Sequence, residues 1–233
     1  MTNPTIIAVA GTDTEIGKTT VTCALLRLLD RRGFDVRGIK PVESGTIDQP
    51  SPEHEDGRRL AAASGQSQPL EALQRLKAPL APPVAAQDEG VELRPERWME
   101  VIRDVGASAD LTFVEGAGGL LSPLADGVDT RRMAVELGTP VLLVAADSLG
   151  TLNHTFLTLE AIEAAGCPVV GVVFSAPLEA DSSTGRNASV VARRYQRLPV
   201  AELPRIDSDD QGADDLEASG FADELLRRLD ELG

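Results

Sequence analysis

Residues 11–19, close to the N-terminus, have the types and spacing that bind phosphate. They read Gly-Thr-Asp-Thr-Glu-Ile-Gly-Lys-Thr and lie between apolar runs at residues 6–10 and 21–26. Glycines allow backbone N–H groups to turn toward an anion, and the start of a following helix adds the positive end of its dipole. Lys18 would neutralise the outer phosphates, and Thr19 would place its hydroxyl on Mg²⁺. The segment therefore predicts a strand, a nucleotide phosphate loop and a helix, although its first glycine lies one residue earlier than the strict motif requires.

Three further segments of polar residues or glycines follow predicted strands: residues 40–44, 115–119 and 147–153. In a doubly wound sheet, ligands bind outside the carboxyl ends of the strands. We therefore expect these segments to meet the phosphate loop in one crevice. Glu115 ends an apolar strand, which is where a carboxylate would hold Mg²⁺ directly or through water.

Four other polar residues have less specific signals. Lys40 lies at a strand end, from which it could reach a phosphate or a developing negative charge, whereas an isolated lysine is more often solvated. Asp56 precedes a predicted helix, where aspartate is most often an ordinary cap. His54 is expected to be exposed, and His154 is expected to be a core or capping neighbour rather than a catalyst. No part of the sequence resembles a Ser/His/Asp or Cys/His nucleophile set.

The apolar pattern places these residues in an α/β protein. Strands that are apolar on both faces alternate with helices, which predicts a mostly parallel, doubly wound sheet with helices on both faces. The length fits one domain over residues 1–233. Together with the phosphate loop, this pattern predicts a P-loop NTPase fold. Strands are expected at residues 6–10, 35–42, 111–115, 140–145 and 169–174.

Helices are expected at residues 18–32, 56–64, 95–106 and 131–137, after Gly150, and in an amphipathic C-terminal segment at residues 221–229. The remaining long segments are expected to be irregular. Residues 46–57 and 78–83 are rich in proline, which suits loops and shaped connections. Residues 207–215 are acidic and are also interpreted as a loop.

Composition excludes several classes of protein. The chain is 42% hydrophobic and 25% charged and has no apolar run of membrane-spanning length, which predicts a globular protein. The N-terminus lacks the basic region of a signal peptide, so the cytoplasm is the expected compartment. A formal net charge of −15 disfavours binding to nucleic acid or to an anionic membrane. Cys23 and Cys167 have no spacing for metal or redox work and are interpreted as packing residues.

Together, four motifs in this order resemble those of the dethiobiotin synthetase family, and the resemblance spans almost the whole chain. They are Gly-Thr-Asp-Thr-Glu-Ile-Gly-Lys-Thr at residues 11–19, Lys-Pro-Val-Glu-Ser-Gly at 40–45, Val-Glu-Gly-Ala-Gly-Gly at 114–119 and Leu-Gly-Thr-Leu-Asn-His at 149–154. The family's phosphate loop has the same extra residue after its first glycine.

The resemblance implies a homodimeric, Mg²⁺- and ATP-dependent ligase of biotin biosynthesis with its active site at the subunit interface. The substrate, 7,8-diaminopelargonic acid, takes up carbon dioxide as a carbamate, which accepts the γ-phosphate of the nucleotide. The second amine then attacks this carbamic-phosphoric anhydride and closes the cyclic urea of dethiobiotin, with release of ADP and phosphate. Carbamate formation and phosphoryl transfer both accumulate negative charge, which two lysines and a metal ion would stabilise.

The resemblance also implies roles for individual residues. The expected catalytic residues are Lys18, Lys40, Thr12 and Ser44, and the expected Mg²⁺ ligands are Thr19, Asp56 and Glu115. The expected nucleotide-binding residues are Glu15, Ile16, Gly17, Lys18, Thr19, Thr20, Asp56, Glu115, Gly116, Ala117, Gly118, Ser175, Ala176, Pro204, Arg205 and Ile206. Thr12 and Ser44 are expected at the diamine end of the substrate, and a helix start donated by the partner subunit is expected to bind its carboxylate. That helix start comprises Gly150, Thr151, Leu152 and Asn153.

This chain departs from the family pattern at three places. It has Ala81-Pro82-Pro83 where many relatives have Ser-Pro-His, so no contact of that serine or histidine carries over. It has Ser175-Ala176 where relatives often place an asparagine that reads adenine, which predicts a relaxed choice among nucleoside triphosphates. Residues 204–206 match the family's nucleotide-edge segment only in the proline.

Two alternatives share the phosphate loop. Synthetases of the cobyrinic acid a,c-diamide kind carry an added glutaminase domain with a nucleophilic cysteine, for which this chain has neither the length nor a suitable Cys/His setting. Partitioning ATPases, which act as nucleotide-switched dimers, have a signature lysine before the loop. Ala10-Gly11-Thr12 stands there instead.

Overall fold

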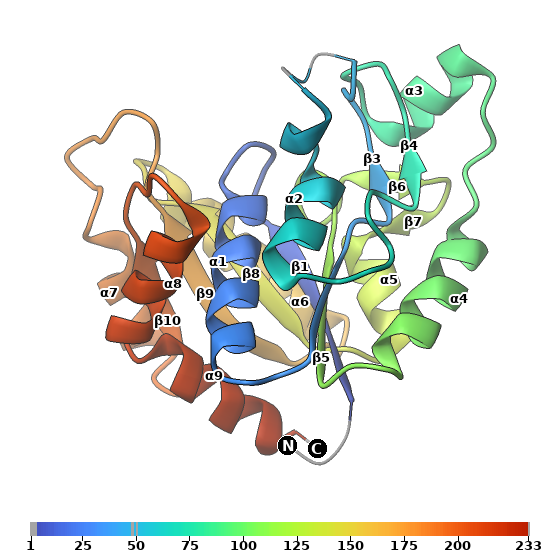
Figure 1. Cartoon of the computed structure of the whole chain (residues 1–233). Helices are drawn as coiled ribbons and strands as arrows, with labels where there is room; N and C mark the ends of the chain where they lie inside the picture. The colour runs from blue at the N-terminus through green and yellow to red at the C-terminus, as the bar shows by residue number, and fades with distance from the viewer. Residues whose placement is uncertain (1–3, 48, 50, 233) are drawn as a thin grey trace.

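Six parallel strands form the central sheet of the computed structural model, which describes residues 4–47, 49 and 51–232 (Figure 1). The order across the sheet is β10-β9-β8-β1-β5-β2, and every pairing within it is parallel. These strands are β1 (Thr5–Gly11), β2 (Val36–Ile39), β5 (Leu111–Glu115), β8 (Val141–Ala146), β9 (Val169–Ser175) and β10 (Val200–Leu203). The predicted parallel sheet is confirmed.

Helices cover both faces of this sheet, so the predicted doubly wound arrangement is also confirmed. They are α1 (Lys18–Arg31), α2 (Asp56–Ser64), α3 (Pro82–Glu89), α4 (Pro95–Gly106), α5 (Thr130–Leu137), α6 (Thr151–Ala164), α7 (Asn187–Arg194), α8 (Asp209–Ala218) and α9 (Phe221–Asp230). The shorter elements are the 3₁₀ turn η1 (Pro52–His54) and two ribbons, β3 (Val42–Glu43) with β4 (Gln74–Arg75) and β6 (Pro123–Ala125) with β7 (Val128–Asp129). Within the described ranges, no helix has the length and apolar character needed to cross a membrane.

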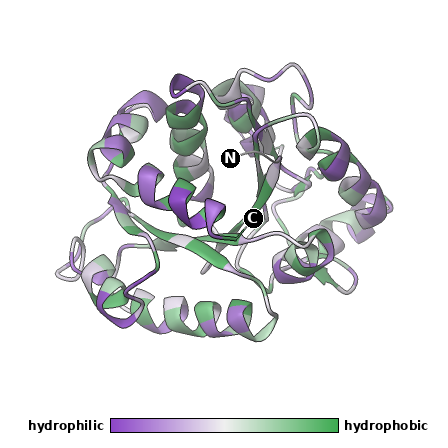
Figure 2. Ribbon diagram, turned by 90° about the horizontal axis from the view of Figure 1, so that it is seen from below, coloured by the Kyte–Doolittle hydropathy of each residue, from purple (hydrophilic) through white to green (hydrophobic). Residues whose placement is uncertain are grey.

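The hydrophobic core lies in two layers, one on each side of the sheet. Along β1, Ile7 and Val9 face the layer of α1, α8 and α9, whereas Ala8 and Ala10 face the layer that contains α6 and α7. This alternation follows from the two-residue period of a strand. Figure 2 shows the consequence, since hydrophobic residues gather along the sheet and hydrophilic ones lie on the outer sides of the helices.

The order of the strands sets the position of a binding crevice. From β1 the chain crosses by α1 to β2 on one side, and from β5 it returns to β8 on the other side of β1. A doubly wound sheet opens outside the carboxyl ends of its strands at such a switch point. In this chain that end carries the loops after β1, β2 and β5.

One predicted loop is wrong. Residues 207–215 were expected to be irregular because they are acidic, but α8 runs from Asp209 to Ala218. Ser208 caps this helix by accepting a hydrogen bond from the backbone N–H of Gln211, and acidic residues in the first turn interact favourably with the helix dipole. Buried Leu216 then packs the helix into the core.

Other differences concern short elements in connections. The predicted strand 35–42 ends at Ile39, and β3, which follows it, belongs to a separate ribbon. Helix α3 begins at Pro82, within the segment that was interpreted only as a connection. Proline fits the first turn of a helix because the N–H that it lacks would be unpaired there. Helix α7 and strand β10 were not predicted. The remaining predicted helices and strands are confirmed within a residue or two at their ends.

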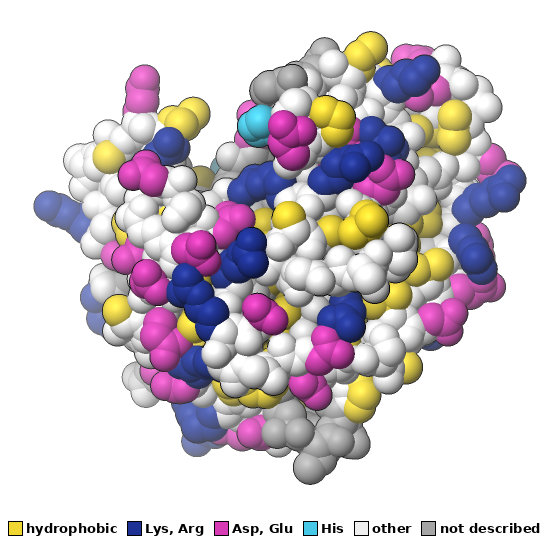
Figure 3. Space-filling view, in the orientation of Figure 1, with side chains coloured by type: hydrophobic (Ala, Val, Ile, Leu, Met, Phe, Trp, Pro, Cys, Tyr) yellow, Lys and Arg dark blue, Asp and Glu magenta, His cyan; other side chains and the backbone are white. Residues whose placement is uncertain are grey.

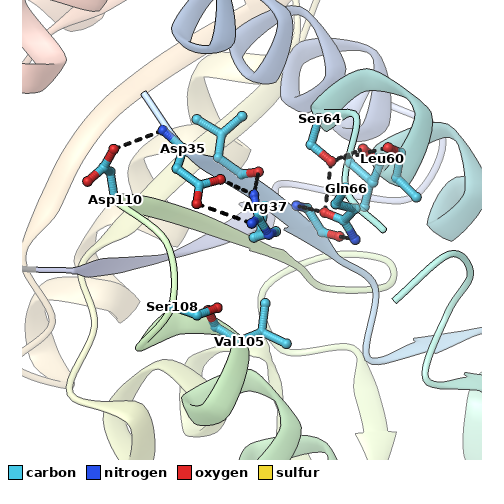
Figure 4. Close-up of polar contacts among 11 residues, drawn as sticks. Asp35, Arg37, Leu60, Ser64, Gln66, Val105, Ser108 and Asp110 are labelled. Carbon is cyan, nitrogen blue, oxygen red and sulfur yellow. Dashed lines mark hydrogen bonds and ion pairs between the residues drawn. The ribbon is translucent and has the colours of Figure 1, made fainter. Parts of the chain in front are cut away.

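A buried glutamine covers part of the edge strand β2 (Figure 4). The side-chain amide of Gln66 accepts a hydrogen bond from the N–H of Gly38 at 2.8 Å and donates one to the C=O of the same residue at 3.1 Å. Ser64 Oγ also donates to Gln66 Oε1 at 2.8 Å. These bonds replace the missing neighbour strand, which protects the edge from pairing with another chain.

Helix α2 begins against a carboxylate from another element. Glu43 of β3 is buried, and it accepts hydrogen bonds from the backbone N–H groups of Asp56 at 2.6 Å and Gly57 at 3.0 Å. A built Cβ on Gly57 would lie 2.1 Å from the backbone nitrogen of Ala72, so the first turn of α2 lies tightly against that segment. Glu43 therefore determines where α2 starts.

We expect Glu43→Ala to lower the free energy of unfolding by about 2 kcal/mol, because two helix N–H groups would lose a charged acceptor in a buried position. Chemical denaturation measures this change. Glu53→Ala, which removes an exposed carboxylate from the neighbouring 3₁₀ turn, is the control and should stay within about 0.5 kcal/mol of the parent. Equal effects of the two changes would contradict the capping role.

Candidate active site

The loop between β1 and α1 has the backbone geometry of a phosphate-binding loop. Gly17 has φ 87°, and a built Cβ on it would lie 2.2 Å from Ser175 Oγ, so both conformation and space require glycine. Glu15 also has positive φ, 53°. Helix α1 then starts at Lys18 without a side-chain cap from the described residues, which leaves its first N–H groups available to an anion.

Beside this loop, four parts of the chain bring together an ionic cluster that is buried except at Asp56, whose side chain is 34% exposed. Glu115, at the end of β5, is 0% exposed, and its Oε1 accepts hydrogen bonds from Thr19 Oγ1 at 2.7 Å and from Lys40 Nζ at 2.8 Å. Lys40 Nζ also donates to Asp56 Oδ2 at 2.8 Å. We call Thr19, Lys40, Asp56 and Glu115 the ionic cluster.

The ionic cluster keeps Lys40 charged. Burial lowers the pKa of Lys40, but the carboxylates of Asp56 and Glu115 outweigh burial and raise it above its ordinary value. Burial likewise raises the pKa of Asp56, and the adjacent Lys40 outweighs that effect and lowers it. Lys40 is therefore a fixed cation at neutral pH rather than a group that exchanges a proton.

Lys18 has a different environment. Its Nζ donates to the backbone oxygen of Asp13 in the phosphate loop at 2.9 Å. Burial, and then the nearby charge of Lys40, lower the pKa of Lys18 to about 8. An arriving phosphate would supply the negative charge that this lysine lacks.

The ionic cluster fits Mg²⁺. Glu115 Oε2 is buried and has no hydrogen-bond partner among the described residues, although a buried carboxylate oxygen normally has one. Thr19 and Asp56 add a hydroxyl and a second carboxylate, and Mg²⁺ prefers such oxygen ligands together with phosphates and water. No group of three or more His, Cys, Asp or Glu side chains suited to a metal occurs within the part of the chain described, so protein carboxylates alone would not complete the coordination shell.

A cavity of about 590 Å³ lies over the phosphate loop and the ionic cluster. Figure 3 shows the surface hollowed at this edge, between the loop after β9 and the segment around α2. Most of the predicted nucleotide residues and both predicted lysines line the cavity, and Glu115 and Gly116 lie buried at its base. The predicted residues in the lining are Glu15, Ile16, Gly17, Lys18, Thr19, Thr20, Lys40, Ser44, Asp56, Ala117 and Gly118.

The two residues predicted at the diamine end lie in different cavities. Ser44 lines the cavity over the phosphate loop, whereas Thr12 lines a second cavity of about 450 Å³. Ser122 lines both, so the two cavities adjoin. His154 also lines the second cavity and is exposed, so its interpretation as a core neighbour is wrong; His54 is exposed as predicted.

The predicted base-edge residues do not line the cavity. Ser175 is buried against Gly17, and Ala176 donates its backbone N–H to Leu203. Pro204 and Arg205 are exposed beyond β10. Ile206 packs against the core beside α1 and α8, and therefore has a structural role in this chain. The predicted relaxed choice among nucleoside triphosphates stays a prediction.

The predicted carboxylate site lies at the start of α6. Gly150 has φ 92°, and this helix, like α1, has no side-chain cap within the described residues. Asn153 is exposed in its first turn. These residues do not line the cavity over the phosphate loop of the same chain.

Several residues that line the cavity had no role assigned from the sequence. Glu43 lies within the motif at 40–45 but had no role assigned to it. Arg59 follows Asp56 by three residues on α2, and this helical spacing could have placed both on one face. Residues 79–82 also line the cavity, and they overlap Ala81-Pro82-Pro83, one of the three departures from the pattern that the sequence resembles. Cys23 and Cys167 are buried free thiols, as predicted.

Comparisons with known proteins identify the family of the chain. A family model described as an AAA domain matches residues 5–211. ATP-dependent dethiobiotin synthetase BioD from Anaeromyxobacter dehalogenans (strain 2CP-C) is 45% identical over 199 residues, which cover 84% of this chain and 88% of the relative. The relative of the same name from Caulobacter sp. (strain K31) is 42% identical, with 94% and 93% covered.

Solved structures of more distant proteins superpose on nearly the whole chain. The cell division ATPase MinD of Pyrococcus furiosus superposes with a TM-score of 0.60 at 20% identity, covering 99% of this chain and 100% of its own. A ParA family ATPase from Chlorobium tepidum has a TM-score of 0.56 at 12% identity, with 96% and 98% covered. At such low identity, these superpositions show a shared P-loop NTPase fold and nothing more. The 45% and 42% identity to the synthetases also shows the family. The chain belongs to the dethiobiotin synthetase family.

Proposed function

We propose that the chain is a Mg²⁺- and ATP-dependent ligase that closes the cyclic urea of dethiobiotin from 7,8-diaminopelargonic acid and carbon dioxide. The observation that carries this proposal is that Lys18 and Lys40 line one cavity. The hydroxyl and carboxylate oxygens of the ionic cluster, which would bind Mg²⁺, lie beside Lys40. The family's reaction requires a site that stabilises a carbamate and a transferring phosphoryl group together.

The chain's own residues divide this work. The N–H groups at the start of α1 and Lys18 would hold the phosphates of the nucleotide. Lys40, which stays protonated, would stabilise the charge that develops between the carbamate oxygen and the γ-phosphate. Thr19, Asp56 and Glu115 would hold Mg²⁺, whose chemistry is to neutralise phosphate charge. Positioning in the crevice supplies most of the remaining catalysis, because phosphoryl transfer needs little covalent participation from the protein.

A homodimer would complete the site. Thr12 and Ser44 line adjoining cavities, so a diamine that reaches from one to the other would contact both. Its carboxylate would then bind the start of α6 in the partner subunit, where the positive end of the helix dipole favours an anion. Exposed apolar side chains beside the second cavity, including Leu121 and Leu157, are suited to such an interface.

The proposed function is tested with isotope-labelled bicarbonate. Incubation with ATP, Mg²⁺ and the diamine should give a labelled product that is absent when the diamine or the nucleotide is left out. Nucleotide hydrolysis that does not respond to the diamine, with no label incorporated, would instead favour a nucleotide-switched ATPase of the partitioning type.

We expect Lys40→Gln to lower kcat at least about a thousandfold, because the developing negative charge loses its fixed cation. Nucleotide binding should stay measurable by calorimetry, since the phosphate loop is unchanged. Glutamine keeps a hydrogen-bond donor beside the buried carboxylates, and thermal unfolding verifies that the variant is folded. The control is Lys77→Ala, which removes an exposed lysine and should leave turnover unchanged. Near-normal turnover of Lys40→Gln would remove Lys40 from the chemistry.

We expect Asn153→Ala to raise KM for the diamine about tenfold while KM for ATP changes little, because the helix start would lose a polar contact to the substrate carboxylate. Glu160→Ala, an exposed change on the same helix, is the control. An unchanged KM for the diamine would count against the carboxylate site at the start of α6.

A further inference from the structure

Arg59 is an arginine of the nucleotide cavity to which the proposed reaction gives no role. It lies on α2 one turn after Asp56, and it lines the same cavity as Thr20 in the first turn of α1. Its side chain is 32% exposed, and one terminal nitrogen, Nη2, lies 3.6 Å from Asp209 Oδ1. Helices α2 and α8, which carry this pair, both pack against α1.

The pair between Arg59 and Asp209 is weak. A separation of 3.6 Å exceeds hydrogen-bond distance, and Asp209 is 31% exposed, so solvent screens the attraction. Asp209 is also the first residue of α8, where the helix dipole stabilises a carboxylate without any arginine. Arg59 can therefore turn toward another anion at small cost.

The charges in the cavity create a need for another cation. Among the described residues of the lining, the basic side chains are Lys18, Lys40 and Arg59. Lys40 already contacts two carboxylates of the ionic cluster. A nucleoside triphosphate carries several negative charges, and a guanidinium is always charged.

We infer that Arg59 is a nucleotide-binding residue, which leaves Asp209 and donates its guanidinium to the phosphate tail of the bound nucleoside triphosphate. Its planar fork of donors suits two phosphate oxygens at once. This inference rests on the proposed function, because it requires that the cavity bind a nucleotide. Arg59 acts in binding and contacts neither the diamine nor the carbamate.

Titration calorimetry with ATP and Mg²⁺ tests the inference on the full-length protein. Arg59→Ala should weaken ATP binding about tenfold, as expected for loss of a charge-assisted hydrogen bond, and Arg59→Lys should lose less. Arg58→Ala is the matched control, since Arg58 is the adjacent residue on α2, pairs with Glu71 and does not line the cavity. It changes the net charge equally and should leave ATP binding unchanged.

The variant Asp209→Asn distinguishes two roles of Arg59: binding the phosphates of ATP, and linking α2 to α8 through its ion pair with Asp209. If Arg59 binds phosphate, removing its carboxylate partner should leave ATP affinity unchanged or increase it. An equal loss of affinity in Arg59→Ala and Asp209→Asn would show that the ion pair acts only as a structural link, which would overturn the inference. So would an unchanged affinity in Arg59→Ala. Failure of the parent protein itself to bind ATP would overturn the proposed function instead.

Discussion

The site depends on one physical constraint, which is that a buried charge needs close partners of opposite charge. Lys40 and Glu115 lie in the protein interior at the ends of adjacent strands, and an unpaired charge there would be strongly destabilising. Their contact, together with Thr19 and Asp56, ties the phosphate loop, two strands and α2 to one point. The requirement to pair these charges in the folded state thus also assembles the nucleotide site.

Arginine supplies most of the positive charge at the surface, whereas lysine supplies most of it in the cavity over the phosphate loop. On the face shown in Figure 3, acidic and basic side chains alternate over α1 and α8, where Arg31 and Arg32 pair with carboxylates of α8 and α9. Arginines supply most of this positive charge. The chain has three lysines, and Lys18 and Lys40 are both in the cavity. A lysine is a compact point charge on a flexible chain, whereas the guanidinium of arginine is a planar fork that suits the paired carboxylates of the surface.

Much of the fold could be predicted from local patterns. Runs of five or six mostly apolar residues identified β1, β5, β8 and β9, and proline and glycine marked both ends of α4. Where local composition was misleading, tertiary packing decided the outcome. The acidic residues before Leu216 suggested a loop, but Ser208 caps a helix there and α1 provides the surface on which it packs. Strand β10 is too short to stand out until it pairs with β9.

The sequence by itself determined that a glycine-containing loop typical of phosphate binding joins a strand to a helix, because glycine spacing and the strand–loop–helix order are local properties. It also placed the chain in its family. Only the tertiary structure decided which side chains meet: that Lys40 lies between Asp56 and Glu115, that Thr12 and Ser44 line separate cavities, and that Ile206 belongs to the core. The reason is that such contacts join residues far apart in the chain, and their geometry follows from strand order and helix packing rather than from neighbouring residues.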